Sequence, residues 1–234
     1  MLASDKARLY HRRVNILAID SATEACSVAL LREDGKVFGE FEIAPRGHNR
    51  LLPEMMRRVL SQAALKKSML SHCAFSNGPG AFTGIRIAAA QAQGIGIGLN
   101  IPLIPVSTLA VLAQTSFDRY PHNSVLVALD ARMQEIYWAL YRRDQAGCAC
   151  LSGSERLTAA DAVDYDNAVE SGAGHGWLAG LQPVTTMSVD PALLPDARSL
   201  LRLASQAVGQ QRTVAAGDIT INYLRNRVAE KARN

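Results

Sequence analysis

The sequence predicts an α/β protein built from two related halves with a cleft between them. Residues 14–20 form a continuous apolar run that ends in an acid, which is typical of a strand buried on both faces. A glycine-rich turn at residues 78–86 separates a short apolar run from a long helical segment. The strand pattern of residues 16–34 then recurs at an offset of 110 positions, which indicates a duplication.

The first half is expected to contain three strands, followed by alternating helices and strands. An Asp34-Gly35 pair predicts a hairpin turn between the second and third strands. Apolar residues at helical spacing predict the first helix. The expected strands cover residues 14–20, 26–31, 37–43, 72–76 and 101–106, and the expected helices cover residues 47–64, 85–99 and 107–120.

The turn Gly78-Pro79-Gly80-Ala81-Phe82-Thr83-Gly84-Ile85-Arg86 connects a strand to a helix. Its first two glycines can adopt positive φ, and Thr83 is the expected N-cap of the helix. Free amides at the helix start would suit a phosphate group, and Arg86 would add positive charge. The alternative, which we favour for so weak a motif, is that the glycines let strand and helix pack closely.

The helix after this turn carries Gly94, Gly96 and Gly98 near its end. Each glycine costs a helix interior about 1 kcal/mol relative to alanine. So costly a run of small residues indicates that something packs close to the helix backbone. The candidates are the protein's own sheet and a helix of a partner protein.

The second half begins at Ser124. At the offset of 110, Asp130 falls on Asp20, and six of nineteen positions are identical. Further strands are expected over 149–157 and 168–172 and a helix over 197–210, but no counterpart of the glycine turn. We therefore predict two domains, residues 1–107 and 108–234, in which the segment from about residue 218 returns to the first domain.

Composition restricts the functional classes. With 48% apolar residues among 234, the chain can form a substantial core. Its 25 basic and 21 acidic residues permit contact with RNA without requiring it. Four cysteines without paired spacing favour a reducing compartment, and the basic first thirteen residues do not resemble a signal peptide. With no apolar run long enough to span a membrane, we expect a cytoplasmic protein without membrane contact.

Four motifs, in this order, resemble the TsaB (YeaZ) family. They are residues 16–30 (ILAIDSATEACSVAL), 78–86 (GPGAFTGIR), 129–138 (LDARMQEIYW) and 223–229 (YLRNRVA), and they leave only the basic residues 1–13 outside. The resemblance implies the duplicated actin-like/sugar-kinase (RNase H-like, ASKHA) fold, which agrees with the repeat. It also implies a role in making threonylcarbamoyladenosine next to the anticodon of tRNAs that read codons beginning with A.

The resemblance further implies a protein that has lost catalysis and acts as a scaffold for a catalytic relative. The implied partners are a threonylcarbamoyl transferase subunit (TsaD-type) and a small ATPase subunit (TsaE-type). Alone, the protein would form a homodimer, and it would meet tRNA indirectly through the complex; the sequence leaves open whether it also touches tRNA directly. The basic residues 1–13 would be a start-site extension.

The histidines agree with the implied loss of catalysis. The transferase subunit of the family holds its metal through an HxxxH pair, whereas no two of the five histidines here are four residues apart. No HExxH motif or nucleophile–base pair is evident either. We therefore expect no catalytic residue, metal or cofactor. The alternatives are an actin-fold phosphotransferase, which should have phosphate loops in both halves, and a glycoprotease-like peptidase.

Weak ATP or ADP binding is a further expectation. Asp20 and Asp130 end the first strand of each half, where actin-like phosphotransferases keep acids for a metal–nucleotide complex. The acids could equally cap strand ends and turn amides. The candidate nucleotide or phosphate site comprises Asp20, Thr23, Gly78, Gly80, Thr83, Gly84, Arg86 and Asp130.

The predicted partner interface combines the helices at residues 47–64 and 83–99. A ridge of leucine and methionine beside a groove of small residues would accept either a second copy or a partner of the same fold. The sequence does not decide which glycines face outward. The candidate interface residues are His48, Leu51, Leu52, Met55, Met56, Ile87, Gln91, Gly94, Ile95 and Gly98.

Overall fold

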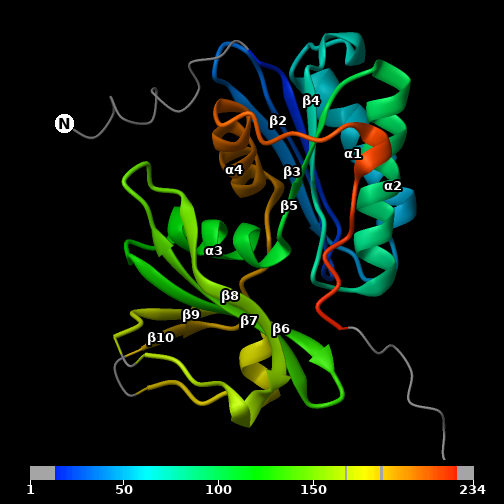
Figure 1. The fold of residues 1–234 in the computed structure, drawn as a ribbon. Helices are drawn as coiled ribbons and strands as arrows, with labels where there is room; N and C mark the ends of the chain where they lie inside the picture. The colour runs from blue at the N-terminus through cyan, green and yellow to red at the C-terminus, as the bar shows by residue number, and fades with distance from the viewer. Residues whose placement is uncertain (1–13, 167, 185–186, 226–234) are drawn as a thin grey trace, which may run out of the picture.

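Two five-stranded sheets form the two halves of the molecule (Figure 1). The structure is a computed structural model that describes residues 14–166, 168–184 and 187–225. The first sheet consists of β1 (Ile16–Asp20), β2 (Ala25–Leu31), β3 (Val37–Ile43), β4 (His72–Ser76) and β5 (Leu103–Val106). The second consists of β6 (Ser124–Arg132), β7 (Glu135–Arg143), β8 (Ala149–Ala159), β9 (Ser171–Ala173) and β10 (Ser188–Asp190).

The order of the strands confirms the predicted duplicated actin-like fold. The first sheet has the order β3-β2-β1-β4-β5, and the second has the equivalent order β8-β7-β6-β9-β10. In each sheet the first strand of the half lies at the centre, antiparallel to the next strand and parallel to the fourth. The strands predicted at residues 149–157 and 168–172 correspond approximately to β8 and β9, whereas β10 was not predicted.

The repeat is not in register throughout. Ala18 lies opposite Ala29 in the first hairpin, whereas Ala128, its counterpart, lies opposite Trp138. The shift arises at a β-bulge between Asp130 and Arg132. A bulge places an extra residue in one strand and moves all later pairs by one position. The gapless alignment therefore matches each strand separately but not the pairing between them.

Helices cover both faces of the first sheet. On one face, α1 (His48–Gln62) and α2 (Phe82–Leu99) bury apolar side chains against β1, β2 and β4. On the other face lies α4 (Ala197–Gly209), which comes from the second half of the chain (Figure 1). Conversely, α3 (Thr108–Arg119) follows β5 but packs on the second sheet. Ser107 is the N-cap of α3, because its hydroxyl accepts hydrogen bonds from two amides of the first turn.

The second half is smaller because short 3-10 turns stand where the first half has α1 and α2. These turns are η3 (Ala160–Ala162) and η4 (His175–Ala179). In η4, the indole of Trp177 fills the face of the sheet and donates a hydrogen bond to the Leu126 carbonyl at 3.2 Å. The Gly174–Gly176 stretch follows β9 as the glycine turn follows β4. Unlike the glycine turn, this stretch leads into a 3-10 helix of five residues and not into a long α-helix.

The chain returns to the first sheet from α4 onward, earlier than the residue 218 expected. Beyond α4, Val214 exchanges two backbone hydrogen bonds with Leu103 at 2.8 and 2.9 Å. Further along, Ile219 and Ile221 pack against the core under α1 and α2. The division into domains at residue 107 remains an interpretation. Residues 1–13 and the 226–229 part of the last motif lie outside the described residues.

The described part of the chain includes no helix that is both long and apolar enough to cross a membrane. All four cysteines are free, and Cys26, Cys73 and Cys148 are buried.

Candidate functional site

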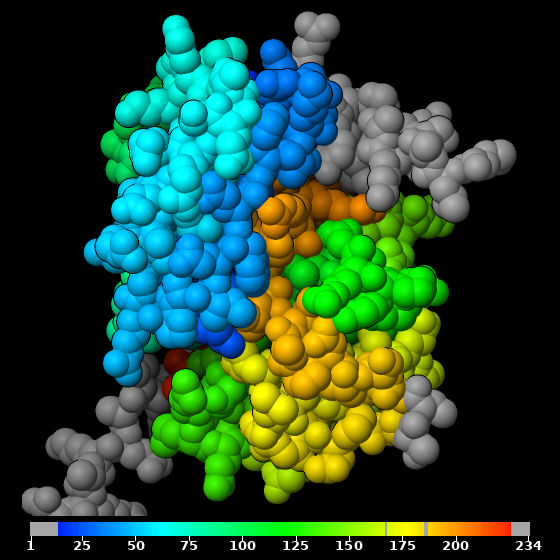
Figure 2. Space-filling model, turned by 180° about the vertical axis from the view of Figure 1, so that it is seen from behind, coloured from blue at the N-terminus to red at the C-terminus, as the bar shows by residue number. Residues whose placement is uncertain are grey.

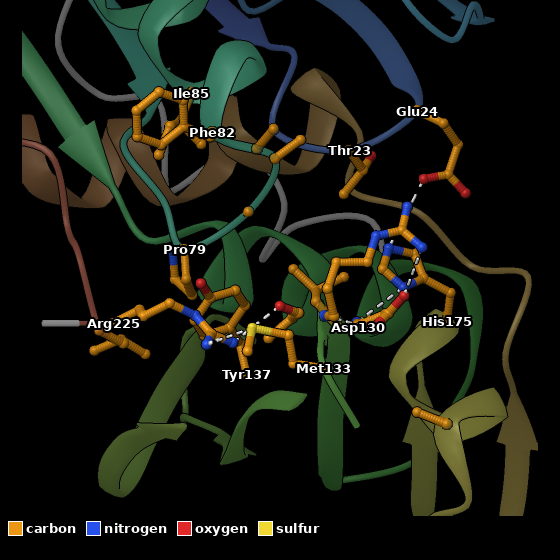
Figure 3. A pocket seen from close by; sticks show the side chains of 18 of the residues that line it. Thr23, Glu24, Pro79, Phe82, Ile85, Asp130, Met133, Tyr137, His175 and Arg225 are labelled. Carbon is orange, nitrogen blue, oxygen red and sulfur yellow. Dashed lines mark hydrogen bonds and ion pairs between the residues drawn. The ribbon is translucent and has the colours of Figure 1, made fainter. Parts of the chain in front are cut away.

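A cleft of about 1240 Å³ opens between the two halves (Figure 3). Its walls come from six parts of the chain: the β1–β2 turn, the segment that leads into α1, the glycine turn, the β6–β7 turn, η4 and residues 222–225. Ligand sites of proteins usually measure about 300–1,000 Å³, so the cleft has ample volume for a small molecule. The side chains that line it decide what it can bind.

Asp20 does not face the cleft. Its side chain is fully buried, accepts a hydrogen bond from the Ala22 amide at 3.1 Å, and is also hydrogen-bonded by the Ser76 hydroxyl. Burial raises the pKa of Asp20 to about 6, although both hydrogen bonds act to lower it. These contacts match the alternative in which Asp20 caps the turn after β1.

Asp130, the counterpart of Asp20, lies at the cleft wall. Its carboxylate accepts a hydrogen bond from the Arg132 amide at 2.7 Å and pairs with the Arg132 guanidinium at 3.1 Å. Its amide donates to Nδ1 of His175 at 2.9 Å. The two strand-end acids therefore have different environments, which the repeat did not reveal.

His175 links the two halves across the cleft. Because Nδ1 accepts a hydrogen bond, the neutral ring carries its proton on Nε2, which lies 3.8 Å from the carboxylate of Glu24 (Figure 3). Burial lowers the pKa of His175, and Glu24 opposes that shift. Neither residue was among the predicted site residues, because the residues that meet here are 151 positions apart in the sequence.

The β6–β7 turn has a costly backbone conformation. Arg132, Met133 and Gln134 have φ angles of 65°, 57° and 63°, in the left-handed region. Each such residue other than glycine costs about 1–2 kcal/mol. Arg225 holds the turn: its guanidinium pairs with Glu135 at 2.7 Å and donates to the Ala131 carbonyl at 3.0 Å. The C-terminal segment thus fixes one wall of the cleft.

The glycine turn packs against the turn after β1. A Cβ atom on Gly84 would lie 2.0 Å from the Ser21 carbonyl oxygen, and one on Gly80 would lie 2.4 Å from that of Ala22. The Ala81 amide is already bonded to the Ala22 carbonyl at 2.8 Å. The glycines therefore have the structural role that we favoured, a close approach of strand and helix.

The predicted N-cap of α2 was wrong. The N-cap is Ala81, two residues earlier than Thr83, and it forms no side-chain cap hydrogen bond. Thr83 is exposed in the first turn. Arg86 stacks on the Phe82 ring at 3.2 Å and lies 5.1 Å from the Tyr223 ring.

The candidate nucleotide residues do not form one phosphate cradle. Thr23, Gly80 and Asp130 line the cleft, whereas Thr83 and Arg86 line a separate groove of about 250 Å³ on the outer side of α2. Asp20 and Gly84 are buried. Gly78, with φ of 103°, packs against the Asn222 backbone. Within the described residues, no three His, Cys, Asp or Glu side chains form a group that could hold a metal ion.

We expect the isolated protein to bind ATP or ADP weakly, with a Kd of about 0.1–1 mM, or about −5.5 to −4 kcal/mol. The affinity should be low because Asp20 is buried away from the cleft and because the carbonyl oxygens of Ser21 and Ala22, which repel phosphate, lie against the glycine turn. Calorimetric titration with each nucleotide measures the affinity directly. Submicromolar binding would show that the cleft is an intact nucleotide site.

The candidate interface residues divide into two groups. Four of them, His48, Leu51, Leu52 and Met55, are buried in the core under α1, so they cannot contact a partner in the folded protein. His48 instead donates from Nε2 to the Ala25 carbonyl at 3.2 Å. The physical reason is that the apolar face of α1 packs on its own sheet. The other group, Met56, Ile87, Gln91, Gly94, Ile95 and Gly98, reaches the surface.

The structure shows which glycines of α2 face outward. Gly94 and Gly98 are exposed, and a Cβ on either would meet no atom within 4 Å. Gly96 points inward, where a Cβ would lie 2.9 Å from side-chain atoms of Leu103 and Ala216. Ile97, which the sequence analysis missed, is 68% exposed beside them. The outer side of α2 is thus a smooth strip that continues into the groove at Thr83 and Arg86.

Comparisons with known proteins agree on one family. The model for TsaD, tRNA N6-adenosine threonylcarbamoyltransferase, matches residues 41–175. The chain is 38% identical over 226 residues to the tRNA threonylcarbamoyladenosine biosynthesis protein TsaB of Escherichia coli K12, covering 93% of this chain and 97% of that protein. The TsaB protein of Haemophilus influenzae Rd is 34% identical over 232 residues, with coverages of 94% and 97%. The solved structure of YeaZ from Pseudomonas aeruginosa superposes with a TM-score of 0.86 at 40% identity, over 90% of this chain and all of that one.

Proposed function

Because the chain belongs to the TsaB (YeaZ) family of tRNA threonylcarbamoyladenosine biosynthesis proteins, we propose that it is the non-catalytic partner of the threonylcarbamoyl transferase subunit. The proposal extends to a complex with a TsaD-type transferase and a TsaE-type ATPase in the cytoplasm. The substrate is the adenosine next to the anticodon in tRNAs that read codons beginning with A.

One observation supports the non-catalytic role above the others. Two of the parts that an actin-like enzyme would direct at its nucleotide, Asp20 and the glycine turn, are used here for internal contacts. Asp20 binds the turn amide and Ser76, and the glycine turn lies against the carbonyls of Ser21 and Ala22. A phosphate group would have to approach those carbonyl oxygens, which repel it. This favours a scaffold over an actin-fold phosphotransferase.

The outer side of α2 is the proposed contact with the transferase. Its small residues allow another helix to approach the backbone closely, and the groove beside it can accept a side chain. A transferase with a related fold can present equivalent helices, which makes a pseudo-symmetric interface. A second copy of this chain can use the same surface, so the homodimer and the complex would compete.

Reconstitution tests the function. We expect modified adenosine only when this protein, the transferase, the ATPase, a threonylcarbamoyl donor and a tRNA reading an A-starting codon are combined. Omitting this protein should abolish the product, because the transferase lacks its scaffold. Mass spectrometry of the digested tRNA measures the modification, and a tRNA that reads other codons is the control.

The protein alone should neither transfer threonylcarbamoyl groups nor hydrolyse peptides, with or without added zinc or iron. Turnover by the isolated protein that rises with its metal content would show instead that it is an enzyme. A transferase that works equally well without this protein would refute the scaffold role.

A further inference from the structure

Positive charge is concentrated in one connection of the fold, residues 44–71, between β3 and β4. This connection contains α1 and carries 6 basic residues and 1 acidic residue. In the other residues that the structure describes, 12 basic residues face 18 acidic ones. The small net charge of the whole chain therefore conceals a strongly polarised molecule.

Five of these cations form no ion pair with any residue that the structure describes. Only Arg58 of the six is paired, with Glu40 at 2.6 Å and with Glu54 at 3.9 Å. No acid within the described residues forms an ion pair with the others, and all five are exposed. We name this set the α1 ridge: Arg46, Arg50, Arg57, Lys66 and Lys67.

The helix geometry aligns the ridge. Arg50 and Arg57 are seven residues apart, close to two turns of helix, so they lie on the same side of α1. That side is opposite Leu51, Met55 and Val59, which pack into the core. Arg46 precedes the helix and also lines the cleft, and the two lysines follow the helix at η2 (Lys67–Met69), so cations stand at both ends of a helix of about 22 Å. Figure 2 shows this connection, in light blue to cyan, on the outer flank of the first half.

We propose that the α1 ridge binds the phosphate backbone of the RNA substrate directly. A row of cations of this length fits a polymer with regularly spaced anions better than a single small anion. Three of the five are arginines, whose guanidinium groups match phosphate oxygens in a bidentate geometry. This inference rests on the proposed function, and it adds a direct RNA contact to the indirect one that the complex provides.

The ridge is distinct from the proposed transferase contact. Gly94 and Gly98 lie on α2, whereas Arg50 and Arg57 lie on the outermost side of α1. The groove at Thr83 and Arg86 is also lined by Asn49 of α1, so an RNA bound to the ridge would run beside a transferase seated on α2. RNA binding and transferase binding can therefore be altered separately.

The test compares two triple variants with the same change in net charge. The ridge variant carries Arg50→Gln, Arg57→Gln and Lys67→Gln. The control variant carries Arg142→Gln, Arg156→Gln and Arg212→Gln, three exposed arginines outside the ridge. Each full-length protein, alone and in complex with the transferase, is titrated with the anticodon stem-loop RNA at several salt concentrations.

We expect the ridge variant to bind RNA about 10-fold or more weakly at low salt. The slope of log K against log salt should become shallower by about 2, because each lost phosphate contact contributes about 0.7–0.9. The control variant should stay within about 2-fold of the wild type with an unchanged slope. Both variants should bind the transferase as the wild type does.

Unchanged RNA binding by the ridge variant, or an equal loss in the control, would overturn the proposal. Loss of the transferase with RNA binding retained would instead make the ridge a protein contact, and so overturn it too. If the wild type fails to bind the transferase at all, the proposed function fails. The RNA titration of the isolated protein still decides the ridge in that case.

Discussion

Gly84→Ala is expected to destabilise the protein by about 3 kcal/mol, at the upper end of the usual cost of overpacking. The added Cβ would lie 2.0 Å from the carbonyl oxygen of Ser21. The oxygen is part of the backbone and the position of the Cβ is fixed by the backbone, so neither atom can rotate away. In addition, Ser21 donates a hydrogen bond to the Gly84 carbonyl at 2.9 Å, so the two segments must separate together. The melting temperature should fall by about 6–12 °C for a chain of this size.

Gly98→Ala in the same helix is the matched control and should have the opposite effect. A Cβ at Gly98 meets no atom within 4 Å, so only the helix preference of alanine remains. This should stabilise the protein by about 0.5–1 kcal/mol. Scanning calorimetry of both variants measures the difference. Equal melting temperatures for Gly84→Ala and the wild type would contradict the close packing of the glycine turn.

Gly94→Leu and Gly98→Leu are each expected to weaken binding to the transferase by about 10–100-fold, or about 1.4–2.8 kcal/mol. The leucine would project from the strip where the partner helix approaches α2. The same changes should weaken the homodimer, because both associations use this surface. Titration by calorimetry measures the complex, and sedimentation measures the homodimer.

Gly209→Leu supplies the control for an enlarged exposed glycine, since it lies on α4 and also has open space around it. It should leave both associations unchanged. Circular dichroism should show that all three variants remain folded. Wild-type affinity in both folded α2 variants would place the partner on another surface.

The sequence revealed the elements well because their burial follows a regular period. The apolar residues of α1 mark its buried face, and the continuous apolar run of β1 marks a strand covered on both sides. The relative orientation of the glycines in α2 could also be predicted from their spacing. Gly94 and Gly98 are four residues apart and must share a side, with Gly96 turned away from it. Which side faces the solvent depends on β5 and on Ala216, and no local pattern contains that information.

The cleft was harder to predict because its properties come from residues that the topology brings together. Asp20 and Asp130 occupy equivalent positions in the repeat. The Asp20 carboxylate is nevertheless buried against Ser76, whereas Asp130 lines the cleft and its amide donates a hydrogen bond to His175. The clamp of Arg225 on Glu135 joins segments far apart in the chain and has no local signature. The repeat predicted where the two strands end. The tertiary contacts around each end determine whether its acid is buried or lines the cleft.

The exchange of helices between the halves bears on how the protein is made. The first sheet is complete at β5, yet one of its faces is covered by α4, which emerges from the ribosome much later. Until then, Ile16, Ala18 and Leu31 lack the α4 side chains that make up much of their core cluster. The core on this face can therefore be completed only after residues 197–209 have been synthesised. Evolution can therefore trim the second half only as far as α4, because that helix belongs to the first half's core.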